Sequence, residues 1–434
     1  MEHSSGRPRQ VTMSPLTAEQ AGYFVEYCKA LQICTGAENK EYDLQKTRPF
    51  ELQGLPGSGK TYLATFFVIH ALRAGARVLV ATPAALQGGP YRKFLRDIEG
   101  FGALTVRTAH KAFKFPVDSS EQHWEMPETM PYDVVLVDEM SQLTARAFTQ
   151  IVRIWLDHGR RFLLLLTGDF QQIPCIDKTV KVPLNATKSS YWNLCLHHCL
   201  REPSLRVTDP VLVSFLRTVR VSVPTITQLD EITAGRRYEV LHERCLTEQL
   251  TAFFNEFPDG IILTVTRRGS NMINEQAATI RGCQCLGSFS LWEDDQLVTR
   301  RLYKNMPIMI TRNLDESQGL VNGGLGTLVN VRSNCLLIKL DDGRMRMVWP
   351  ITEKQNTSTR VMQQGFCVVP AYACTIHKVQ GATLPAACIW FESCRNVFVG
   401  PGLGYVACSR VSGLDKLRFL GAVQTDAFTP VSQG

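Results

Sequence analysis

Short apolar runs of strand length alternate with segments of helical spacing in the first part of the chain. Strands that alternate with helices are typical of a parallel sheet with helices on both faces. The pattern therefore predicts a first α/β domain over residues 46–178. Its expected strands cover residues 50–53, 77–81, 134–137 and 162–167.

The same alternation returns later, on either side of a stretch with a different pattern. Residues 260–265 and 387–391 are predicted strands, and a helical segment follows the first of them. Between them, residues 281–365 hold short alternating runs separated by Asn-Gly-Gly and Asp-Asp-Gly, which are typical of β-hairpins. We therefore expect a second α/β domain, formed by residues 179–280 and 366–434, with a small all-β insertion.

Two smaller segments complete the predicted organisation. Residues 1–45 read as a polar tail followed by a helix, because Ser14-Pro15 offers a helix start and residues 21–31 have helical spacing. Residues 113–132 form a short insertion with prolines and aromatic residues inside the first domain.

Composition and charge narrow the class of protein without deciding it. The chain has 434 residues, 44% hydrophobic content and a net charge of +7, which suits a globular protein and is compatible with a polyanionic partner. No apolar run approaches the ~20 residues of a membrane span, so we expect no membrane partner. Residues 1–10 are polar, which predicts residence in the nucleus or cytoplasm and not secretion. The 14 cysteines lack the spacing of a zinc site.

A phosphate-binding motif lies between the first predicted strand and the following helix. Residues 54–61 match G-x-x-x-x-G-K-[ST], whose glycines let backbone N–H groups surround phosphates. Lys60 is expected to reach the β- and γ-phosphates, and the Thr61 hydroxyl to bind Mg²⁺. The other residues expected to hold the nucleotide are Gly54, Pro56, Gly57, Ser58 and Gly59.

An acidic pair follows the third predicted strand. Asp138 is suited to hold Mg²⁺, and Glu139 to orient or deprotonate the attacking water. With the phosphate-binding motif, the pair predicts hydrolysis of a nucleoside triphosphate. It does not decide what the hydrolysis drives, because this fold hosts many functions.

Further motifs follow one another from Leu16 to Leu417. They cover residues 16–20, 81–83, 108–113, 168–174, 313–326, 375–384 and 405–411. In type and order they resemble the Pif/RecD-like branch of superfamily 1 helicases. The resemblance implies two RecA-like motor domains, with residues 113–132 as a small wedge and residues 281–365 as an SH3-like insertion.

The resemblance also implies roles for single residues. Gln20 would read the adenine, Gln172 would sense the γ-phosphate and Gly381 would contact the nucleotide. Arg410 would reach ATP across the cleft between the domains, and arginines in such positions stabilise the transition state. Arg201 fits the second arginine position best, with Arg206 as its rival.

Single-stranded nucleic acid is usually bound by cations beside aromatic residues. The residues that the resemblance assigns to this contact are Pro83, Thr108, His110, Lys111, Phe113, Asn322, His377 and Lys378.

The implied function is that of an ATP- and Mg²⁺-dependent DNA helicase. It would move 5′ to 3′ on single-stranded DNA and open forked DNA, with replication or repair proteins as partners. Its compact size would suit a virus- or mobile-element-encoded helicase. A viral-type superfamily 1 RNA helicase and a non-unwinding DNA-stimulated ATPase clamp stay open as alternatives. Asn322-Gly323 and Ser409-Arg410 favour the DNA branch.

Overall fold

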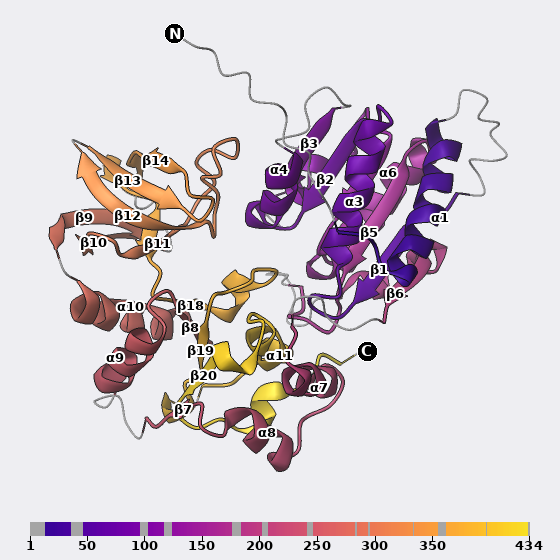
Figure 1. Cartoon of the computed structure of the whole chain (residues 1–434). Helices are drawn as coiled ribbons and strands as arrows, with labels where there is room; N and C mark the ends of the chain where they lie inside the picture. The colour runs from indigo at the N-terminus through magenta and orange to yellow at the C-terminus, as the bar shows by residue number, and fades with distance from the viewer. Residues whose placement is uncertain are drawn as a thin grey trace, which may run out of the picture. The chain divides into compact units, whose positions relative to one another are not determined.

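The computed structural model divides the chain into two compact units, Met1–Arg206 and Val207–Gly434 (Figure 1). The structure describes residues 14–35, 47–95, 103–116, 124–175, 184–201, 207–240, 246–282, 284–293, 296–332, 334–354, 362–395 and 397–432.

The first unit is built on a six-stranded parallel sheet. The strand order is β3-β2-β4-β5-β1-β6. These strands are β1 (Phe50–Gly54), β2 (Val78–Thr82), β3 (Leu104–Thr108), β4 (Val134–Val137), β5 (Leu163–Gly168) and β6 (Leu196–Leu200). Its helices are α1 (Ala18–Thr35), α3 (Lys60–Arg73), α4 (Gly89–Leu95), α5 (Ala109–Phe113) and α6 (Ala145–Asp157).

Helices cover both faces of this sheet, which explains its apolar central strands. All four residues of β4 are buried. Val134 and Leu136 pack into a core with α1 and α3, whereas Val135 and Val137 pack into a second core with α6. Successive side chains of a strand point to opposite faces, so a strand covered on both sides must be apolar throughout.

The second unit holds a five-stranded parallel sheet in the order β18-β8-β19-β20-β7. These strands are β7 (Arg237–Tyr238), β8 (Ile261–Thr264), β18 (Ala373–Thr375), β19 (Ala387–Trp390) and β20 (Leu417–Leu420). Its helices are α7 (Pro210–Val219), α8 (Ile226–Thr233), α9 (Leu246–Glu256), α10 (Arg267–Arg281) and α11 (Leu403–Cys408). The predicted fold class, two α/β domains with parallel sheets, is confirmed.

An all-β part of the second unit lies between α10 and β18. Its main sheet is antiparallel, in the order β14-β13-β12-β11-β17, and two hairpins, β9–β10 and β15–β16, accompany it. The strands are β9 (Cys285–Glu293), β10 (Gln296–Tyr303), β11 (Pro307–Ile310), β12 (Leu325–Arg332), β13 (Cys335–Leu340), β14 (Met345–Val348), β15 (Ile351–Lys354), β16 (Met362–Gly365) and β17 (Val368–Pro370). Leu328 and Ile338 of this sheet share one core with Leu250 and Ile273 of α9 and α10, so the insertion is fastened to the α/β part by packing.

The expected boundary after residue 178 differs from the observed one. Residues 196–200, expected in the second domain, form β6 and pair in parallel with β1 of the first sheet. The sheet of the first unit therefore extends to Leu200. The physical reason is that β6 covers the open edge of β1, which would otherwise leave backbone N–H and C=O groups unpaired.

The expected wedge lies only partly within the described residues, because residues 117–123 are outside them. Trp124, just after that gap, donates a hydrogen bond from Nε1 to the carbonyl oxygen of Phe113 at 2.9 Å. Met130 and Tyr132 pack against the core of the first unit. The described ends of the insertion are thus held by the core of the first unit.

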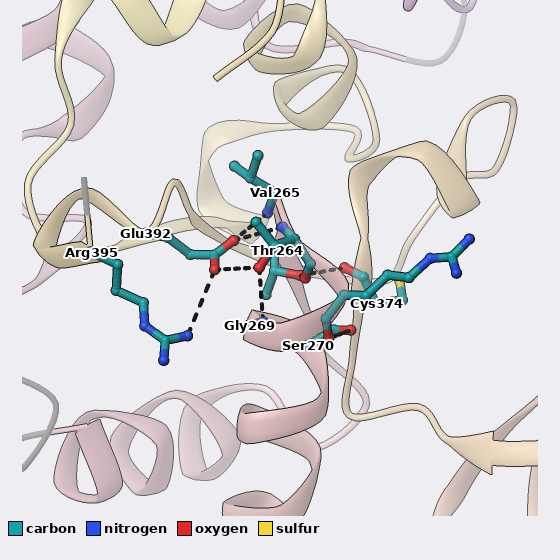
Figure 2. A network of polar contacts seen from close by, with 9 residues as sticks. Thr264, Val265, Gly269, Ser270, Cys374, Glu392 and Arg395 are labelled. Atoms are coloured by element: carbon teal, nitrogen blue, oxygen red, sulfur yellow. Dashed lines mark hydrogen bonds and ion pairs between the residues drawn. The ribbon is translucent and has the colours of Figure 1, made fainter. Parts of the chain in front are cut away.

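A buried carboxylate organises the end of the second sheet where β8 passes into α10 (Figure 2). Glu392, two residues after β19, is fully buried. Its carboxylate accepts hydrogen bonds from the N–H groups of Val265 and Thr266 at 2.9 and 2.7 Å, and from the Thr266 hydroxyl at 2.7 Å. The Arg395 guanidinium lies 4.0 Å away. The first turn of α10 is close enough that Gly269 has no room for a side chain.

Because of this network, we expect a single substitution at Glu392 to lower the unfolding free energy of the second unit. Glu392→Gln keeps the size of the side chain but replaces one acceptor oxygen with an NH₂ group that faces backbone donors. Hydrogen bonds to a charged group contribute about 1.5–3 kcal/mol, so we expect the second unit to lose about 2 kcal/mol of unfolding free energy. Urea denaturation followed by circular dichroism measures it. Glu239→Gln, at an exposed ion pair with Arg237, is the control; equal losses in both variants would contradict the account.

Candidate nucleotide-binding site and nucleic-acid interface

The phosphate-binding loop connects β1 with α3, as the sequence predicts. Gly57 and Gly59 have φ values of 78° and 90°, a left-handed conformation that glycine adopts without strain. The N–H of Ser58 donates to the carbonyl oxygen of Leu55 at 3.1 Å and closes the turn. Helix α3 begins at Lys60, so the positive end of its dipole lies at the loop. This geometry suits phosphate binding.

The Lys60 side chain is folded into the concave side of this loop. Its ammonium group donates to the carbonyl oxygens of Gly54 and Leu55 at 2.7 and 3.1 Å. The side chain is largely buried, so the charge is fixed in position and not free to sample solvent. A cation held in this place is well sited for the outer phosphates of a nucleotide.

Asp138, directly after β4, is the centre of the site. Its carboxylate is 3% exposed and has donors from four different segments. The Tyr91 and Thr61 hydroxyls donate to Oδ2 at 2.7 and 3.3 Å. The Thr167 hydroxyl and the Glu139 N–H, the latter at 2.9 Å, donate to Oδ1. A buried carboxylate is stable only with such donors, so these contacts fix its orientation.

Tyr91 is the functional candidate that the sequence did not reveal. It lies on α4, is completely buried and is 47 positions away from Asp138. Burial, together with the negative charge of Asp138, raises the pKa of its hydroxyl well above the usual value. The group therefore stays protonated and acts as a permanent donor. No local motif marks it, because the contact arises only when α4 packs against the sheet.

The donor set fits a magnesium ion bound together with a triphosphate. Mg²⁺ prefers hard oxygen ligands and commonly uses one or two protein oxygens with phosphates and water. The Thr61 hydroxyl and Asp138 Oδ2, 3.3 Å apart, are such a pair. The Ser58 hydroxyl is buried in the loop and, among the described residues, has no hydrogen-bond partner. It is one more buried polar group of the loop that a ligand could satisfy.

Glu139 has an unusual backbone conformation, with φ 54°. A non-glycine residue in the left-handed region costs roughly 1 kcal/mol, and such positions often occur at functional sites. The turn is closed by the Gln142 N–H, which donates to the Glu139 carbonyl oxygen at 3.0 Å. The role of Glu139 toward water stays a prediction.

The segment that carries Gln172 is fixed to the residues after the acidic pair. The N–H of Asp169 donates to the Ser141 hydroxyl at 3.3 Å, and the N–H of Gln171 donates to the Asp169 carboxylate at 3.1 Å. Gln172 is buried, and its Oε1 has no hydrogen-bond partner within the described part of the chain. Such a side chain is suited to change partner when a γ-phosphate is present or lost.

Gln20 connects α1 to the phosphate-binding loop. Its Nε2 donates to the Ser58 carbonyl oxygen at 3.4 Å, and its Oε1 accepts from the Thr17 N–H at 3.1 Å. The residue is buried. The structure thus places the predicted adenine-reading residue directly against the loop, and its contact with a base stays a prediction.

The arginine predictions need one correction. Arg201 was expected on the second domain, but it follows β6 in the first unit, the unit that also holds Lys60. Its backbone N–H donates to the Glu19 carboxylate at 3.0 Å. As part of the sheet that carries the loop, it is not placed to act from the opposite domain. Its rival Arg206 lies outside the described residues.

Arg410 is on the second unit, as expected, and is 1% exposed. Its guanidinium donates to the carbonyl oxygens of Val406, Val379 and Ala382 at 2.9, 3.2 and 3.2 Å. These contacts join α11 to the turn that follows β18. Gly381, in the same turn, is exposed with φ 85°.

The predicted nucleic-acid contacts of the first unit fall into two groups. Thr108 caps α5 by accepting a hydrogen bond from the Lys111 N–H at 3.4 Å, and His110 and Lys111 are exposed. Pro83 is half-buried. Phe113, by contrast, is 1% exposed and belongs to the core. Its assignment to strand contact is wrong, because a ring packed in the core has no face to offer a base.

In the second unit, His377 and Lys378 are exposed on a short 3-10 helix directly after β18. Part of the His377 imidazole is nevertheless removed from water, and this partial burial lowers its pKa, with a further contribution from the nearby charge of Arg267. Arg267 and Arg268 are exposed at the start of α10 and were missed in the sequence. Asn322 is exposed in the all-β part, where its N–H donates to Asn313 Oδ1 at 2.9 Å.

Known proteins that resemble this chain include ATP-dependent enzymes, in agreement with a nucleotide-binding loop. A family model described as AAA domain matches residues 42–178. The ATP-dependent DNA helicase PIF1 of Danio rerio is 27% identical over 66% of this chain and 46% of its own length. The ATP-dependent DNA helicase Pif1 of Bdellovibrio bacteriovorus is 25% identical over 85% of this chain and 83% of its own length. The crystal structure of Bacteroides Pif1 bound to single-stranded DNA, 17% identical, superposes with a TM-score of 0.67 over 96% of this chain and 95% of that one. This chain is thus similar in sequence to Pif1 helicases and has the fold of the solved Pif1 structures.

The resemblance predicted from the motifs is thereby confirmed. This Pif1-like chain spans about half the length of the animal relatives that it matches, 46% in the case of Danio rerio. Within the described residues, no helix is both long and apolar enough to cross a membrane.

Removal of the Tyr91 hydroxyl tests whether Asp138 depends on it. We expect Tyr91→Phe to raise the Mg²⁺ concentration needed for half-maximal ATP hydrolysis about tenfold, because groups that orient a metal ligand typically contribute that much. Tyr62→Phe is the control, because its hydroxyl donates to the Ser14 carbonyl oxygen and not to Asp138. It should leave the Mg²⁺ requirement unchanged. An unchanged Mg²⁺ requirement in Tyr91→Phe would assign this tyrosine to packing alone.

Proposed function

We propose that this protein is an ATP-dependent DNA helicase that uses hydrolysis to translocate on single-stranded DNA and unwind duplex DNA. The observation that carries the proposal is the fixed Asp138 carboxylate beside the loop of Lys60 and Thr61, in a chain with two parallel-sheet units. The relatives support it, since they are ATP-dependent DNA helicases and the Bacteroides protein has been solved with single-stranded DNA and ADP-AlF₃.

In this proposal ATP binds to the loop between β1 and α3 with Mg²⁺ at Thr61 and Asp138. The metal supplies positive charge that offsets the charge of the phosphates. Lys60 binds the outer phosphates, and Glu139 orients the attacking water. Gln172 responds to the γ-phosphate, and Gln20 contacts the base.

Arg410 would act on the nucleotide from the second unit. Its guanidinium binds carbonyl oxygens of its own unit, so contact with ATP would require these hydrogen bonds to be exchanged. That exchange would move the turn of His377 and Lys378 when ATP binds. Nucleotide state and grip on the strand would thus be coupled through one side chain. The second arginine is left between Arg201, which follows β6 of the first sheet, and Arg206, which lies outside the described residues.

The strand would run over residues at the carboxyl ends of strands in both parallel sheets and over one residue of the all-β part. The supporting positions are Pro83, Thr108, His110 and Lys111 in the first unit and Asn322, His377 and Lys378 in the second. We add Arg267 and Arg268 to this set, because both are exposed at the start of α10 and the charge of Arg267 acts on His377. Movement is proposed to be 5′ to 3′.

The domain assignment follows from the same reasoning. We propose a first motor domain that ends after Leu200, a second that resumes at Val207, and the all-β insertion as an accessory to the second. We propose replication, repair or recombination, in the nucleus or cytoplasm, as the setting of this activity. An RNA helicase and a non-unwinding clamp are the alternatives.

Two substitutions separate nucleotide binding from cleavage. Lys60→Ala removes the cation for the phosphates, and we expect hydrolysis to fall about 10²–10³-fold. Glu139→Gln should bind ATP normally but cleave it at a similarly reduced rate, since only the group that orients water is changed. Fluorescent-ATP binding and phosphate release measure the two steps. Near-normal turnover in Lys60→Ala would contradict the loop assignment, and loss of ATP binding in Glu139→Gln would give Glu139 a structural role.

Strand displacement on tailed duplexes tests the proposed activity itself. We expect unwinding of a duplex with a 5′ single-stranded tail, in the presence of ATP and Mg²⁺, and little on a 3′-tailed duplex. The Glu139→Gln variant is the control for ATP-independent opening. ATP hydrolysis without displacement from either tail would favour the clamp.

A further inference from the structure

The main sheet of the all-β part ends on a strand with an open edge. β14 stands last in the order β14-β13-β12-β11-β17, so within the described residues it pairs with β13 alone. Figure 1 shows it at the outer edge of that orange sheet. An edge strand presents N–H and C=O groups to which another extended segment can bind.

The register shows which residues face that open edge. The Leu340 N–H donates to the Arg344 carbonyl oxygen at 3.0 Å across the turn that joins β13 to β14. In an antiparallel pair, bonded positions alternate along the strand, so Met345 and Met347 direct their backbone groups away from β13. The outward Met345 carbonyl oxygen accepts from the Arg346 guanidinium at 2.8 Å, and the same guanidinium donates to the Gln318 carbonyl oxygen at 3.1 Å, so an added strand must displace Arg346 at this position.

The side chains at the same positions form an exposed apolar stripe. Met345, Met347 and Trp349 are 43%, 54% and 55% exposed, whereas Val348 between them is buried. Alternate residues of a strand share one face, and Met347 lies opposite Leu337 of β13 on that face. An extended partner would therefore meet backbone donors and acceptors together with evenly spaced apolar side chains.

A groove of about 590 Å³ lies at this strand, and its walls are mostly apolar. The loop that precedes β12 contributes to one wall, and β14 with the residues after it contributes to the other. Its apolar lining includes Leu314, Leu320, Leu337, Met347, Trp349 and Ile351. Methionine side chains are flexible and adapt to different apolar partners.

The charges beside the stripe are of both signs, and the exposed Lys339 is the one that favours an acidic group on the partner. Lys339 is exposed and lies directly opposite Met345, and the Arg344 side chain is 45% exposed. Asp342 lies 3.6 Å from Arg344, and Asp315 lines the groove. A single-stranded nucleic acid would need a continuous track of cations, whereas an apolar peptide needs only a flanking charge.

We propose that β14 binds an extended apolar segment of a partner protein by strand addition. The segment places alternate apolar side chains on Met345, Met347 and Trp349 and a carboxylate near Lys339. This surface belongs to the second unit, whereas the nucleotide-binding loop belongs to the first.

The probe is a phage-displayed library of random dodecapeptides, selected on the full chain, with the strongest peptide then synthesised. We expect selected sequences to alternate apolar residues and to carry an acidic residue at one end. Met347→Lys and Trp349→Ala should each weaken the peptide about tenfold or more, as truncation of a central contact does. Ile226→Lys changes an exposed apolar residue on α8 and should leave the Kd unchanged.

The rate of backbone amide hydrogen exchange tests strand addition directly, because contact through side chains alone would not change it. Peptide binding by strand addition should slow exchange of the Met345, Met347 and Trp349 amides, while ATP hydrolysis stays at the wild-type rate in all three variants. The proposal is overturned if no peptide is enriched over the Met347→Lys chain, or if selected peptides bind both chains equally. It is also overturned if a thymidine 20-mer, and not the peptide, protects these amides.

Discussion

The buried carboxylate of Asp138 is the interaction on which the rest of the first unit depends. It gathers hydroxyl groups from α3, α4 and β5 and the N–H of its own successor. A charge removed from water is stable only when its lone pairs are satisfied, so four segments are held in one arrangement. That arrangement places Thr61 and Lys60 where a metal-bound triphosphate would sit. Structural stability and catalytic geometry therefore rest on the same contacts.

In the second unit, the N–H groups at a helix start are satisfied in a different way. This unit also has a strand, a loop and a helix, from β8 to α10, but the N–H groups there bind the protein's own Glu392 carboxylate. A helix start filled by an internal anion has no place for a phosphate, whereas the loop before α3 has one. The two units are thus alike in sheet type but differ at this helix start. The loop of the first unit suits a phosphate, whereas the helix start of the second unit is occupied by Glu392. The second unit displays cations such as Lys378 and Arg267 at the corresponding end of its sheet.

Local features of the site were readable from the sequence, and features that depend on packing were not. The glycines, Lys60 and Thr61 act within one loop, and β4 with Asp138 is a continuous apolar run that ends in a charge. Tyr91 was missed because its contact spans 47 positions. β6 was missed because its burial alternates at a sheet edge, which leaves a weak signal. Phe113 was misassigned because an aromatic residue in a motif looks the same in sequence whether its ring faces solvent or the core.

The central claim is that cleavage of a triphosphate at this site serves movement on a DNA strand. The most direct measurement is the steady-state rate of ATP hydrolysis with single-stranded DNA, with single-stranded RNA of the same sequence, and with neither. The account predicts a clear stimulation by DNA over both other conditions. An identical rate in all three, or stimulation by RNA alone, would contradict it.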